Sequence, residues 1–333
     1  MAKKIAINGF GRIGRLFFRL AYEDPGVDIV AINDISDLKT SAHLLKYDST
    51  YGRYGHDVEV EMGEQKYLII DGNKIPFYSE MNPEDLPWGD LDVDVAYEST
   101  GVFRKKSGFS KHLIAGAKKV FVSAPAKECD CTIVYGVNND AYKPDMTSMS
   151  GASCTTNCLA PISKVLNDNF GIEKGIMTTI HAYTNTQNVL DFRHKDLRRA
   201  RAAAQNLIPT TTGAAKAIGL VIPELNGLLD GFAVRAPVID GSVVDMKVQL
   251  KTETTAEEIN AAMKKASEGA LKDVLGYSED PIVSTDVIGI GNGSLFYPEF
   301  TKVIGGNFAS VLSWYDNEQS FTTQSLRCVR DLM

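Results

Sequence analysis

The first part of the chain alternates short apolar runs with an amphipathic stretch, which predicts two strands with a helix between them. Residues 4–8 and 27–32 are apolar runs of strand length, and residues 15–21 place their apolar side chains on one side of a helix. The glycine-rich residues 9–14 connect the first strand to this helix. The order of strand, glycine loop, helix and strand is typical of a unit with two parallel strands.

Two later apolar runs of the first half, residues 93–97 and 120–122, are each followed by small polar residues. These are Ser99, Thr100, Gly101 and Ser123. Because the carboxyl ends of parallel strands meet along one edge of a sheet, such residues suit a ligand crevice at that edge. Residues 67–70 and 74–77 predict a hairpin insert.

The second half of the chain shows the alternation expected of a half-buried sheet. Residues 244–250 alternate apolar and polar side chains, as in an antiparallel sheet with one face in water. Residues 228–236 and 307–314 predict further strands. Residues 255–258 form a capping box that opens a helix, and the chain after Tyr315 predicts a last helix.

Residues 9–14, Gly-Phe-Gly-Arg-Ile-Gly, match the G-x-G-x-x-G pattern of dinucleotide-binding folds. Glycines let the backbone approach a pyrophosphate, which the free N–H groups at the helix start attract. Asp34 lies 20 residues after Gly14, where a carboxylate accepts the ribose hydroxyls and repels a 2′-phosphate. A glycine-rich turn alone is common, but the complete unit in register favours a dinucleotide site. We predict this site from Gly9, Phe10, Gly11, Arg12, Ile13, Gly14, Asn33, Asp34, Ser99, Thr100, Gly101 and Ser123.

These patterns predict an α/β chain with a doubly wound parallel sheet of the Rossmann type, followed by an α+β domain with a mainly antiparallel sheet. The length of 333 residues agrees with two domains. The composition, 44% hydrophobic and 23% charged, is that of a globular protein. The net charge is −7, so we do not expect nucleic acid as a primary partner.

Five cysteines in a chain of this length do not make a disulfide framework. The first residues show no apolar leader, and no stretch of about 18 apolar residues marks a membrane helix. We therefore expect reduced thiols in a cytoplasmic protein without a membrane partner.

Cys154 stands in a polar run directly before a helix predicted over residues 162–169. A buried core thiol is a common fate, but the Ser, Thr and Asn neighbours argue against an apolar slot. A zinc site needs more ligands than Cys154 and Cys158 supply, and we predict no metal site. The third alternative is a nucleophile. With a helix cap at Ser153 or Ser150, Cys154 lies in or beside the first helical turn, where the helix dipole lowers the pKa of a thiol.

A nucleophilic cysteine needs a base, and His181 follows a strand predicted over residues 175–180. A strand end can face a helix start in an α/β domain, which would bring His181 to Cys154. Taken alone, His181 is more often a structural histidine. The pairing favours the base, although the spacing does not prove it.

Residues 193–201 carry five Lys or Arg side chains against one acidic residue. Most of them fit a solvated or subunit-facing loop, and the alternative is attraction of a phosphate or a polynucleotide. Aromatic residues are not interleaved, which argues against stacking on a single strand. Thr212 and Gly213 end a polar turn before a short helical run, and helix starts of this kind bind phosphate.

Five segments together resemble phosphorylating glyceraldehyde-3-phosphate dehydrogenases, and the resemblance runs from Ile5 to the C-terminus. The segments are residues 7–15 (INGFGRIGR), 152–161 (ASCTTNCLAP), 194–201 (HKDLRRAR), 212–216 (TGAAK) and 313–318 (SWYDNE).

The resemblance implies a role for each candidate residue. Cys154 attacks an aldehyde to form a thiohemiacetal, and His181 takes the thiol proton and assists hydride departure to NAD. Inorganic phosphate then cleaves the thioester to an acyl phosphate. Residues that match phosphate-binding positions of the family are Thr184, Arg235 and Arg199, with Ser153, Thr155, Thr212 and Gly213 for the attacking phosphate. Asn317 matches the residue that orients the nicotinamide carboxamide.

The resemblance also implies a glycolytic enzyme that converts D-glyceraldehyde 3-phosphate to 1,3-bisphosphoglycerate and assembles as a homotetramer. The dinucleotide-binding domain would comprise residues 1–152 and 317–333, and the catalytic domain residues 153–316. Residues from about 183 to 207 match the S-shaped loop that lines subunit contacts.

The sharpest departure from the family is Phe192-Arg193, where many NAD-using members have Leu-Pro or Gly-Pro. Arg193 would attract a 2′-phosphate and Asp34 would repel it, so we expect a preference for NAD with some tolerance of NADP. An erythrose-4-phosphate dehydrogenase shares the scaffold, but the complete set of phosphate positions argues against it. A secondary, non-catalytic binding role is disfavoured because Cys154, His181 and Arg235 are all present.

Overall fold

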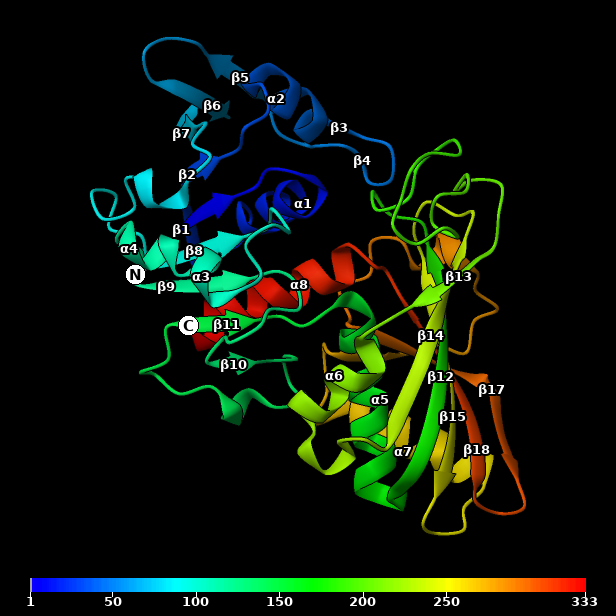
Figure 1. Ribbon diagram of the computed structural model, residues 1–333. Coiled ribbons are helices and arrows are strands. Elements are labelled where there is room, and N and C mark those ends of the chain that lie inside the picture. The colour runs from blue at the N-terminus through cyan, green and yellow to red at the C-terminus, as the bar shows by residue number, and fades with distance from the viewer. Residues whose placement is uncertain (1) are drawn as a thin grey trace. The chain divides into compact units, whose positions relative to one another are not determined.

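The computed structural model describes residues 2–333 and divides the chain into two compact units (Figure 1). The first unit comprises Met1–Ile133, Asn139–Ala152 and Ser325–Met333, and the second comprises Val134–Asn138 and Ser153–Gln324. After the short segment Val134–Asn138, the chain enters the second unit again at Ser153, the first residue of the predicted catalytic domain. It returns to the first unit at Ser325, within helix α8 (Gln319–Arg327) and after the predicted position at residue 317.

The first unit is built on a nine-stranded sheet in the order β10-β11-β9-β8-β1-β2-β7-β6-β5. All neighbours are parallel except β5–β6 and β6–β7, so the doubly wound parallel sheet is confirmed. The strands are β1 (Lys3–Asn8), β2 (Val27–Asn33), β5 (Val58–Glu61), β6 (Lys66–Ile70), β7 (Asn73–Tyr78), β8 (Val95–Glu98), β9 (Lys119–Val122), β10 (Cys131–Thr132) and β11 (Ser148–Ser150). A separate pair joins β3 (Tyr47–Asp48) to β4 (Gly52–Arg53).

Four helices belong to this unit: α1 (Arg12–Ala21), α2 (Leu38–Lys46), α3 (Lys106–Phe109) and α4 (Lys111–Ile114). Helix α1 begins directly after Gly11 and buries Leu16, Phe17, Phe18 and Ala21 on one side. Because these apolar side chains share one side, the sequence pattern predicted this helix. Helix α4 ends at Ile114, because Gly116 adopts a positive φ of 100° that the helix cannot continue through.

The second unit is built on a seven-stranded sheet in the order β13-β14-β12-β15-β18-β17-β16. Four of its six neighbouring pairs are antiparallel and two, β12–β14 and β16–β17, are parallel, so the mainly antiparallel sheet is confirmed. The strands are β12 (Ile172–Ala182), β13 (Ile208–Thr211), β14 (Leu229–Ala236), β15 (Ser242–Leu250), β16 (Leu275–Tyr277), β17 (Ser294–Ile304) and β18 (Phe308–Tyr315).

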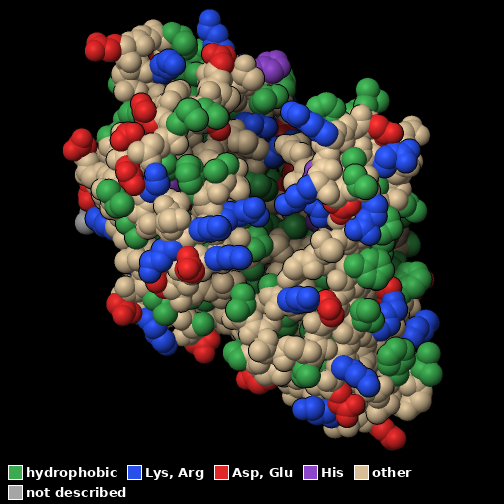
Figure 2. All heavy atoms as spheres, in the orientation of Figure 1, with side chains coloured by type: hydrophobic (Ala, Val, Ile, Leu, Met, Phe, Trp, Pro, Cys, Tyr) green, Lys and Arg blue, Asp and Glu red, His purple; other side chains and the backbone are tan. Residues whose placement is uncertain are grey.

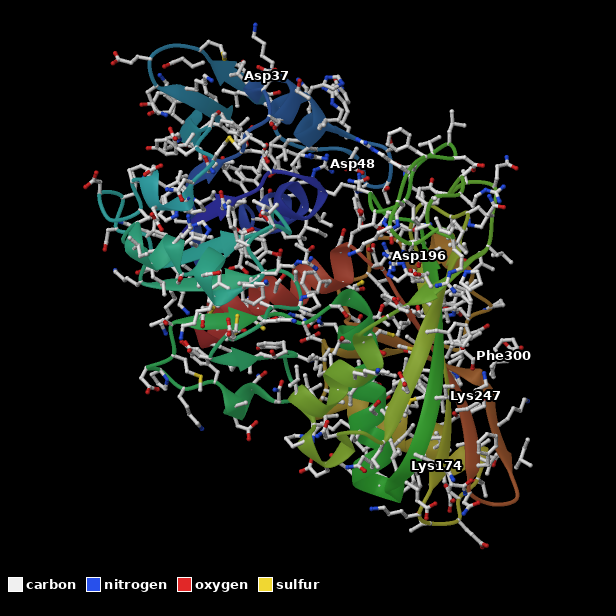
Figure 3. The ribbon with its side chains drawn as sticks, viewed as in Figure 1. Asp37, Asp48, Lys174, Asp196, Lys247 and Phe300 are labelled. Carbon is white, nitrogen blue, oxygen red and sulfur yellow. The ribbon has the colours of Figure 1, made fainter. Side chains whose placement is uncertain are left out.

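Helices α5 (Cys154–Phe170), α6 (Ala214–Val221) and α7 (Ala256–Glu268) cover one face of this sheet (Figure 1). Along β15, Val244 and Met246 are buried toward the helices while Lys247 is half-exposed, as the alternation predicts. Figure 3 shows Lys247 and Phe300 on the side of the sheet away from α5 and α6. The capping box at Thr255 is present, with its side chain accepting the Glu258 N–H.

One helix start and one strand end in this unit bear on the site. The cap predicted at Ser153 is present, so helix α5 begins at Cys154 and includes the helix predicted over residues 162–169. Strand β12 runs through His181 instead of ending before it, because β14 pairs with it as far as Ala182. Short 3-10 turns lie at Pro83–Asp85, Asn139–Ala141, Pro223–Leu225 and Ser284–Val287, and a π-helical turn at Cys328–Leu332. In residues 2–333 no helix is long and apolar enough to cross a membrane.

Candidate active site

Cys154 occupies the first position of α5, directly after a left-handed turn of the backbone. Ala152 adopts a φ of 59°, a conformation that costs a non-glycine residue of the order of 1 kcal/mol and turns the chain toward the helix. Ser153 then caps the helix, since its Oγ accepts the Thr156 N–H at 3.1 Å. The Cys154 thiol is therefore held at a fixed helix start while it remains partly exposed.

The structure brings His181 to Cys154. The Sγ of Cys154 and the Nε2 of His181 are 3.5 Å apart, within hydrogen-bonding distance for sulfur. The imidazole is 4% exposed and packs against the edge of the Tyr315 ring, with the ring centroids 5.8 Å apart. This places an acid–base group directly against the thiol.

The other nitrogen of His181 faces a carbonyl. Nδ1 lies 2.7 Å from the Ala182 carbonyl oxygen, which also accepts a hydrogen bond from the Arg235 guanidinium at 2.9 Å. That oxygen can only accept, whereas the Arg235 guanidinium, 3.0 Å from the same Nδ1, can only donate. Because the contact with the carbonyl is the shorter one and the guanidinium donates to that carbonyl, a proton on Nδ1 is favoured, which turns Nε2 toward the sulfur. One further proton is then shared between Sγ and Nε2, and the pair titrates as a unit.

Burial opposes charge on either member of this pair. Burial raises the pKa of the Cys154 thiol, and the positive charge of Arg235 only partly offsets it. Our expectation that the helix start lowers this pKa overall is therefore wrong, because desolvation outweighs the dipole and the nearby cation. Burial, followed by the charge of Arg235, lowers the pKa of His181 to about 3. A neutral imidazole is the form that can accept the thiol proton.

Two arginines place positive charge beside this pair. Arg235 lies opposite His181 in the parallel register of β14 and β12, and its Nε is buried without a hydrogen-bond partner. Arg199 donates from Nε to the Thr210 hydroxyl at 2.8 Å, and its charge also acts on His181. Asp196, labelled in Figure 3, accepts from the same Thr210 hydroxyl at 3.0 Å and so holds the loop of Arg199 against β13.

The predicted phosphate-binding hydroxyls each have a protein partner. Thr155 bonds to the Tyr315 hydroxyl at 2.9 Å, and Thr184 to the Thr186 hydroxyl at 3.0 Å. Thr212 accepts the Ala214 N–H at 3.2 Å at the start of α6, which leaves its own proton to donate. Gly213, the cap of that helix, is exposed, and a Cβ built there meets nothing within 4 Å. Thr155 is buried, whereas Thr212 is partly exposed and Gly213 is exposed at the start of α6.

Two residues for which no role was predicted organise this site. Tyr315 is buried between Thr155 and Thr179, and its hydroxyl bonds to both, at 2.9 and 2.8 Å. Ser242 accepts the Ala182 N–H at 3.0 Å and donates to the Asn317 Oδ1 at 2.6 Å. The predicted cofactor residue Asn317 is thus tied through Ser242 to the residue that follows His181. Only Tyr315 lay in a quoted motif, whereas Ser242 carries no signal in the sequence.

The first unit contains a cavity of about 410 Å³ at the carboxyl ends of its parallel strands. Six predicted residues line it: Gly9, Gly11, Asn33, Asp34, Ser99 and Thr100. Phe10, Arg12, Ile13, Gly14, Gly101 and Ser123 are not among the lining residues. Residues that the sequence did not indicate also line it, namely Asn8, Ile35, Glu80, Met81, Val102 and Phe103.

The glycine loop of this cavity fits the diphosphate of a dinucleotide. A Cβ at Gly14 would lie 2.0 Å from the Gly9 carbonyl oxygen, and one at Gly9 2.6 Å from the Thr100 nitrogen. At Gly11, which lines the cavity, a Cβ would meet nothing within 4 Å, so this backbone is open to a ligand. The loop is packed tightly on its protein side and bare on the other, as a phosphate cradle requires.

Asp34 and Arg12 are both held by neighbours. The Asp34 carboxylate accepts the Phe10 N–H at 2.5 Å and the Ser36 N–H at 2.7 Å, which fixes it at the rim of the cavity. The Arg12 guanidinium pairs with Asp48 at 3.1 Å, so its side chain is engaged within the first unit. Among residues 2–333, no group of three or more His, Cys, Asp or Glu side chains is arranged to hold a metal ion. Figure 2 shows acidic and basic side chains interspersed over the visible surface.

Two family models match the chain. Residues 3–106 match the NAD binding domain of glyceraldehyde 3-phosphate dehydrogenase, and residues 153–317 match its C-terminal domain. The chain belongs to the glyceraldehyde-3-phosphate dehydrogenase family. The resemblance identified from the sequence is therefore confirmed, and NAD is the cofactor of the matched first domain.

Curated members of the glyceraldehyde-3-phosphate dehydrogenase family match over nearly the whole length. The chain is 53% identical over 326 residues to glyceraldehyde-3-phosphate dehydrogenase 2 of Streptomyces avermitilis, 54% over 323 residues to the enzyme of Geobacillus stearothermophilus, and 55% over 329 residues to that of Clostridium acetobutylicum. Each alignment covers 97% of this chain and 96% of the relative.

The two glycines of the cradle predict opposite outcomes when each is replaced by alanine. Gly14→Ala drives a methyl group into the Gly9 carbonyl, so we expect lower stability against urea together with weaker NAD binding. Gly11→Ala has room for its methyl group within the protein, so we expect unchanged stability and a loss of NAD affinity of at least about tenfold. Urea unfolding and calorimetric NAD titration measure both. Wild-type affinity in Gly11→Ala would show that the diphosphate does not lie on this loop.

Proposed function

We propose that the protein oxidises D-glyceraldehyde 3-phosphate and phosphorylates the product to 1,3-bisphosphoglycerate, with NAD and inorganic phosphate as co-substrates. The observation that carries this proposal is the 3.5 Å contact between Cys154 Sγ and His181 Nε2 beside the half-buried Arg235 guanidinium. A thiol with an adjacent base suits covalent catalysis on a carbonyl, and two arginines suit an anionic substrate. When bound, NAD accepts a hydride from the reacting carbon and so supplies the oxidation.

The Cys154–His181 pair moves one proton back and forth through the proposed reaction. Nε2 takes the thiol proton as Sγ attacks the aldehyde carbon, and it returns this proton to the carbonyl oxygen to form a thiohemiacetal. Nε2 removes the hydroxyl proton again as the carbon is oxidised to the thioester. A phosphate oxygen then attacks the thioester carbon, the C–S bond breaks, and the sulfur leaves as a thiolate that takes the proton from Nε2. The enzyme thus returns to its starting state.

Two groups of polar side chains are proposed for the two phosphates. Thr184 and Arg235 are assigned to the phosphate of the aldehyde. The buried Arg235 Nε and the buried Nε2 of Gln187, whose Oε1 accepts the Thr184 N–H, are donors without protein partners and support this assignment. The inorganic phosphate is assigned to Ser153, Thr155, Thr212 and Gly213, and Arg199 is assigned to phosphate binding beside them. Here the Thr212 hydroxyl accepts the Ala214 N–H and keeps its own proton to donate, and the Ser153 hydroxyl caps α5 beside the Thr156 hydroxyl at 2.7 Å.

For the cofactor we propose residues 1–152 with 317–333 as the binding domain and residues 153–316 as the catalytic domain. Gly9 to Gly14 hold the diphosphate, and Asn33 and Asp34 hold the adenosine ribose. Ser99, Thr100, Gly101 and Ser123 complete the site, and Asn317 holds the carboxamide. In support of the Asn317 assignment, its Oδ1 is occupied by Ser242, which leaves the amide nitrogen as the group to present.

We also propose that the protein works as a homotetramer in the cytoplasm. In support, large apolar side chains are exposed on the sheet face opposite the helices, including Ile176, Phe232 and Phe300, and along residues 189–197. All five cysteines are free, which agrees with a reducing compartment.

The direct test of this function is dependence on inorganic phosphate. With D-glyceraldehyde 3-phosphate and NAD, we expect NADH formation to require added phosphate and to yield an acyl phosphate, because the thioester needs an attacking oxygen. Cys154→Ser is expected to lower turnover at least about a thousandfold while NAD affinity stays at the wild-type level. Turnover that is independent of phosphate, or faster on erythrose 4-phosphate, would favour the alternative dehydrogenase.

Cofactor choice follows from the fixed carboxylate of Asp34. We expect kcat/KM for NAD to exceed that for NADP, since a 2′-phosphate would lie against a carboxylate that two backbone N–H groups hold in place. Asp34→Ala should reduce the ratio of kcat/KM for NAD to kcat/KM for NADP by at least about tenfold. Arg193→Ala should raise this ratio, because it removes the positive charge that would attract the 2′-phosphate of NADP. An NADP preference in the wild-type protein would contradict the assignment.

A further inference from the structure

A buried carboxylate lies beneath the dinucleotide cavity of the first unit. Glu98, the last residue of β8, is only 2% exposed. Its Oε1 accepts two hydrogen bonds from Thr100, from the backbone N–H at 2.8 Å and from the hydroxyl. Its Oε2 accepts from the Asn8 amide at 2.6 Å and lies 3.0 Å from the Nε2 of His112. Each oxygen thus faces two groups that can donate a hydrogen bond, which suits a carboxylate.

The histidine behind this carboxylate has a defined tautomer. The indole Nε1–H of Trp88 can only donate, and it lies 3.0 Å from the His112 Nδ1. Nδ1 must therefore accept, so the proton of the neutral ring is on Nε2 and points at Glu98. Trp88 and His112 are both completely buried. In the row of Trp88, His112 and Glu98, every hydrogen bond is therefore donated toward the cavity. Trp88 donates to His112, and His112 donates to Glu98.

The network continues across the strand ends that form the cavity floor. The Asn8 Oδ1 accepts from the Asn33 amide at 2.7 Å, which joins the ends of the neighbouring strands β1 and β2. Asn33 also bonds to both backbone groups of Glu80, at 3.0 and 2.8 Å. Asn8, Asn33, Glu80 and Thr100 all line the cavity, whereas Glu98, His112 and Trp88 do not.

We propose that Glu98 is a positioning residue for NAD and that, with His112 behind it, it holds the two loops of the dinucleotide cavity at their binding distance. Through Asn8 it fixes the start of the glycine loop, and through Thr100 it fixes the loop opposite. The spacing between these loops is tight, since a Cβ at Gly9 would lie 2.6 Å from the Thr100 nitrogen. The Ser99 hydroxyl adds a second link, to the Gly9 carbonyl at 2.7 Å. The inference rests on NAD as the cofactor of this unit.

Stability alone gives no reason for a charge at this position. Burying a carboxylate costs free energy that its hydrogen bonds only partly return, and well-packed apolar side chains often replace buried charged networks without loss. The rest of the core around Trp88 is apolar, including Ala96, Phe109 and Val120. The charge does supply directed contacts, because three of its four donors belong to Asn8 and Thr100, which line the cavity. Glu98 therefore orients the cavity rather than only filling the core.

The test is Glu98→Gln, which keeps the shape but turns one oxygen into an NH2 group that faces two donors. We expect the calorimetric Kd for NAD and the KM for NAD to rise at least about tenfold, while kcat at saturating NAD changes less than about threefold. Trp88→Phe is the matched control. It removes the hydrogen bond at the far end of the row and leaves all four donors to Glu98, so stability should fall while the Kd stays within about twofold of wild type.

A second variant keeps the proposal open to refutation if Glu98→Gln does not fold. His112→Leu removes one donor to Glu98 from a position that does not line the cavity, and we expect the Kd for NAD to rise about three- to tenfold. Unchanged affinity in a folded Glu98→Gln or, failing that, in His112→Leu would overturn the positioning role, as would equal losses in Trp88→Phe. Failure of the wild-type protein to bind NAD would instead refute the cofactor assignment itself.

Discussion

The contact between the Cys154 thiol and the His181 imidazole is the constraint on which the rest of the second unit depends. It requires a helix that begins at the cysteine, a strand that runs through the histidine, and a neighbouring strand that places Arg235 beside both. The cap at Ser153 and the left-handed turn at Ala152 meet the first requirement, and the parallel register of β12 and β14 meets the others. The Ala182 carbonyl then orients the imidazole, so that backbone geometry rather than a third acidic side chain directs Nε2 at the sulfur.

Burial and charge oppose each other at this pair, and the balance explains its chemistry. Burial raises the pKa of the thiol and lowers that of the imidazole, so each group alone is neutral. A proton passed from Sγ to Nε2 creates two opposite charges 3.5 Å apart without changing the net charge. Arg235 favours the anionic sulfur and disfavours the cationic ring. The pair is therefore suited to passing a proton at each step rather than to storing charge on one member.

Local signals in the sequence were sufficient for much of the fold and for the pairing of Cys154 with His181, which the structure places in contact. The glycine loop with Asp34, the alternation of β15 and the capping box at Thr255 each depend on residues close in sequence, and each is present. The direction of the Cys154 pKa was predicted wrongly, because burial is set by the whole unit and the helix start only by its neighbours. Ser242 and the row of Trp88, His112 and Glu98 could not be predicted, since their partners lie far away along the chain.

The most direct test of the central claim is the pH profile of Cys154 alkylation by iodoacetamide in the wild-type protein and in His181→Asn, with Cys154→Ser as the background. If His181 is the acceptor of the thiol proton, the His181→Asn variant lacks the group that takes this proton. Burial then keeps the pKa of the Cys154 thiol high. The alkylation rate near pH 7 should then fall at least about tenfold, and the midpoint of the profile should move to higher pH. Superimposable profiles for the two proteins would show that the thiol reacts without His181 and would contradict the account.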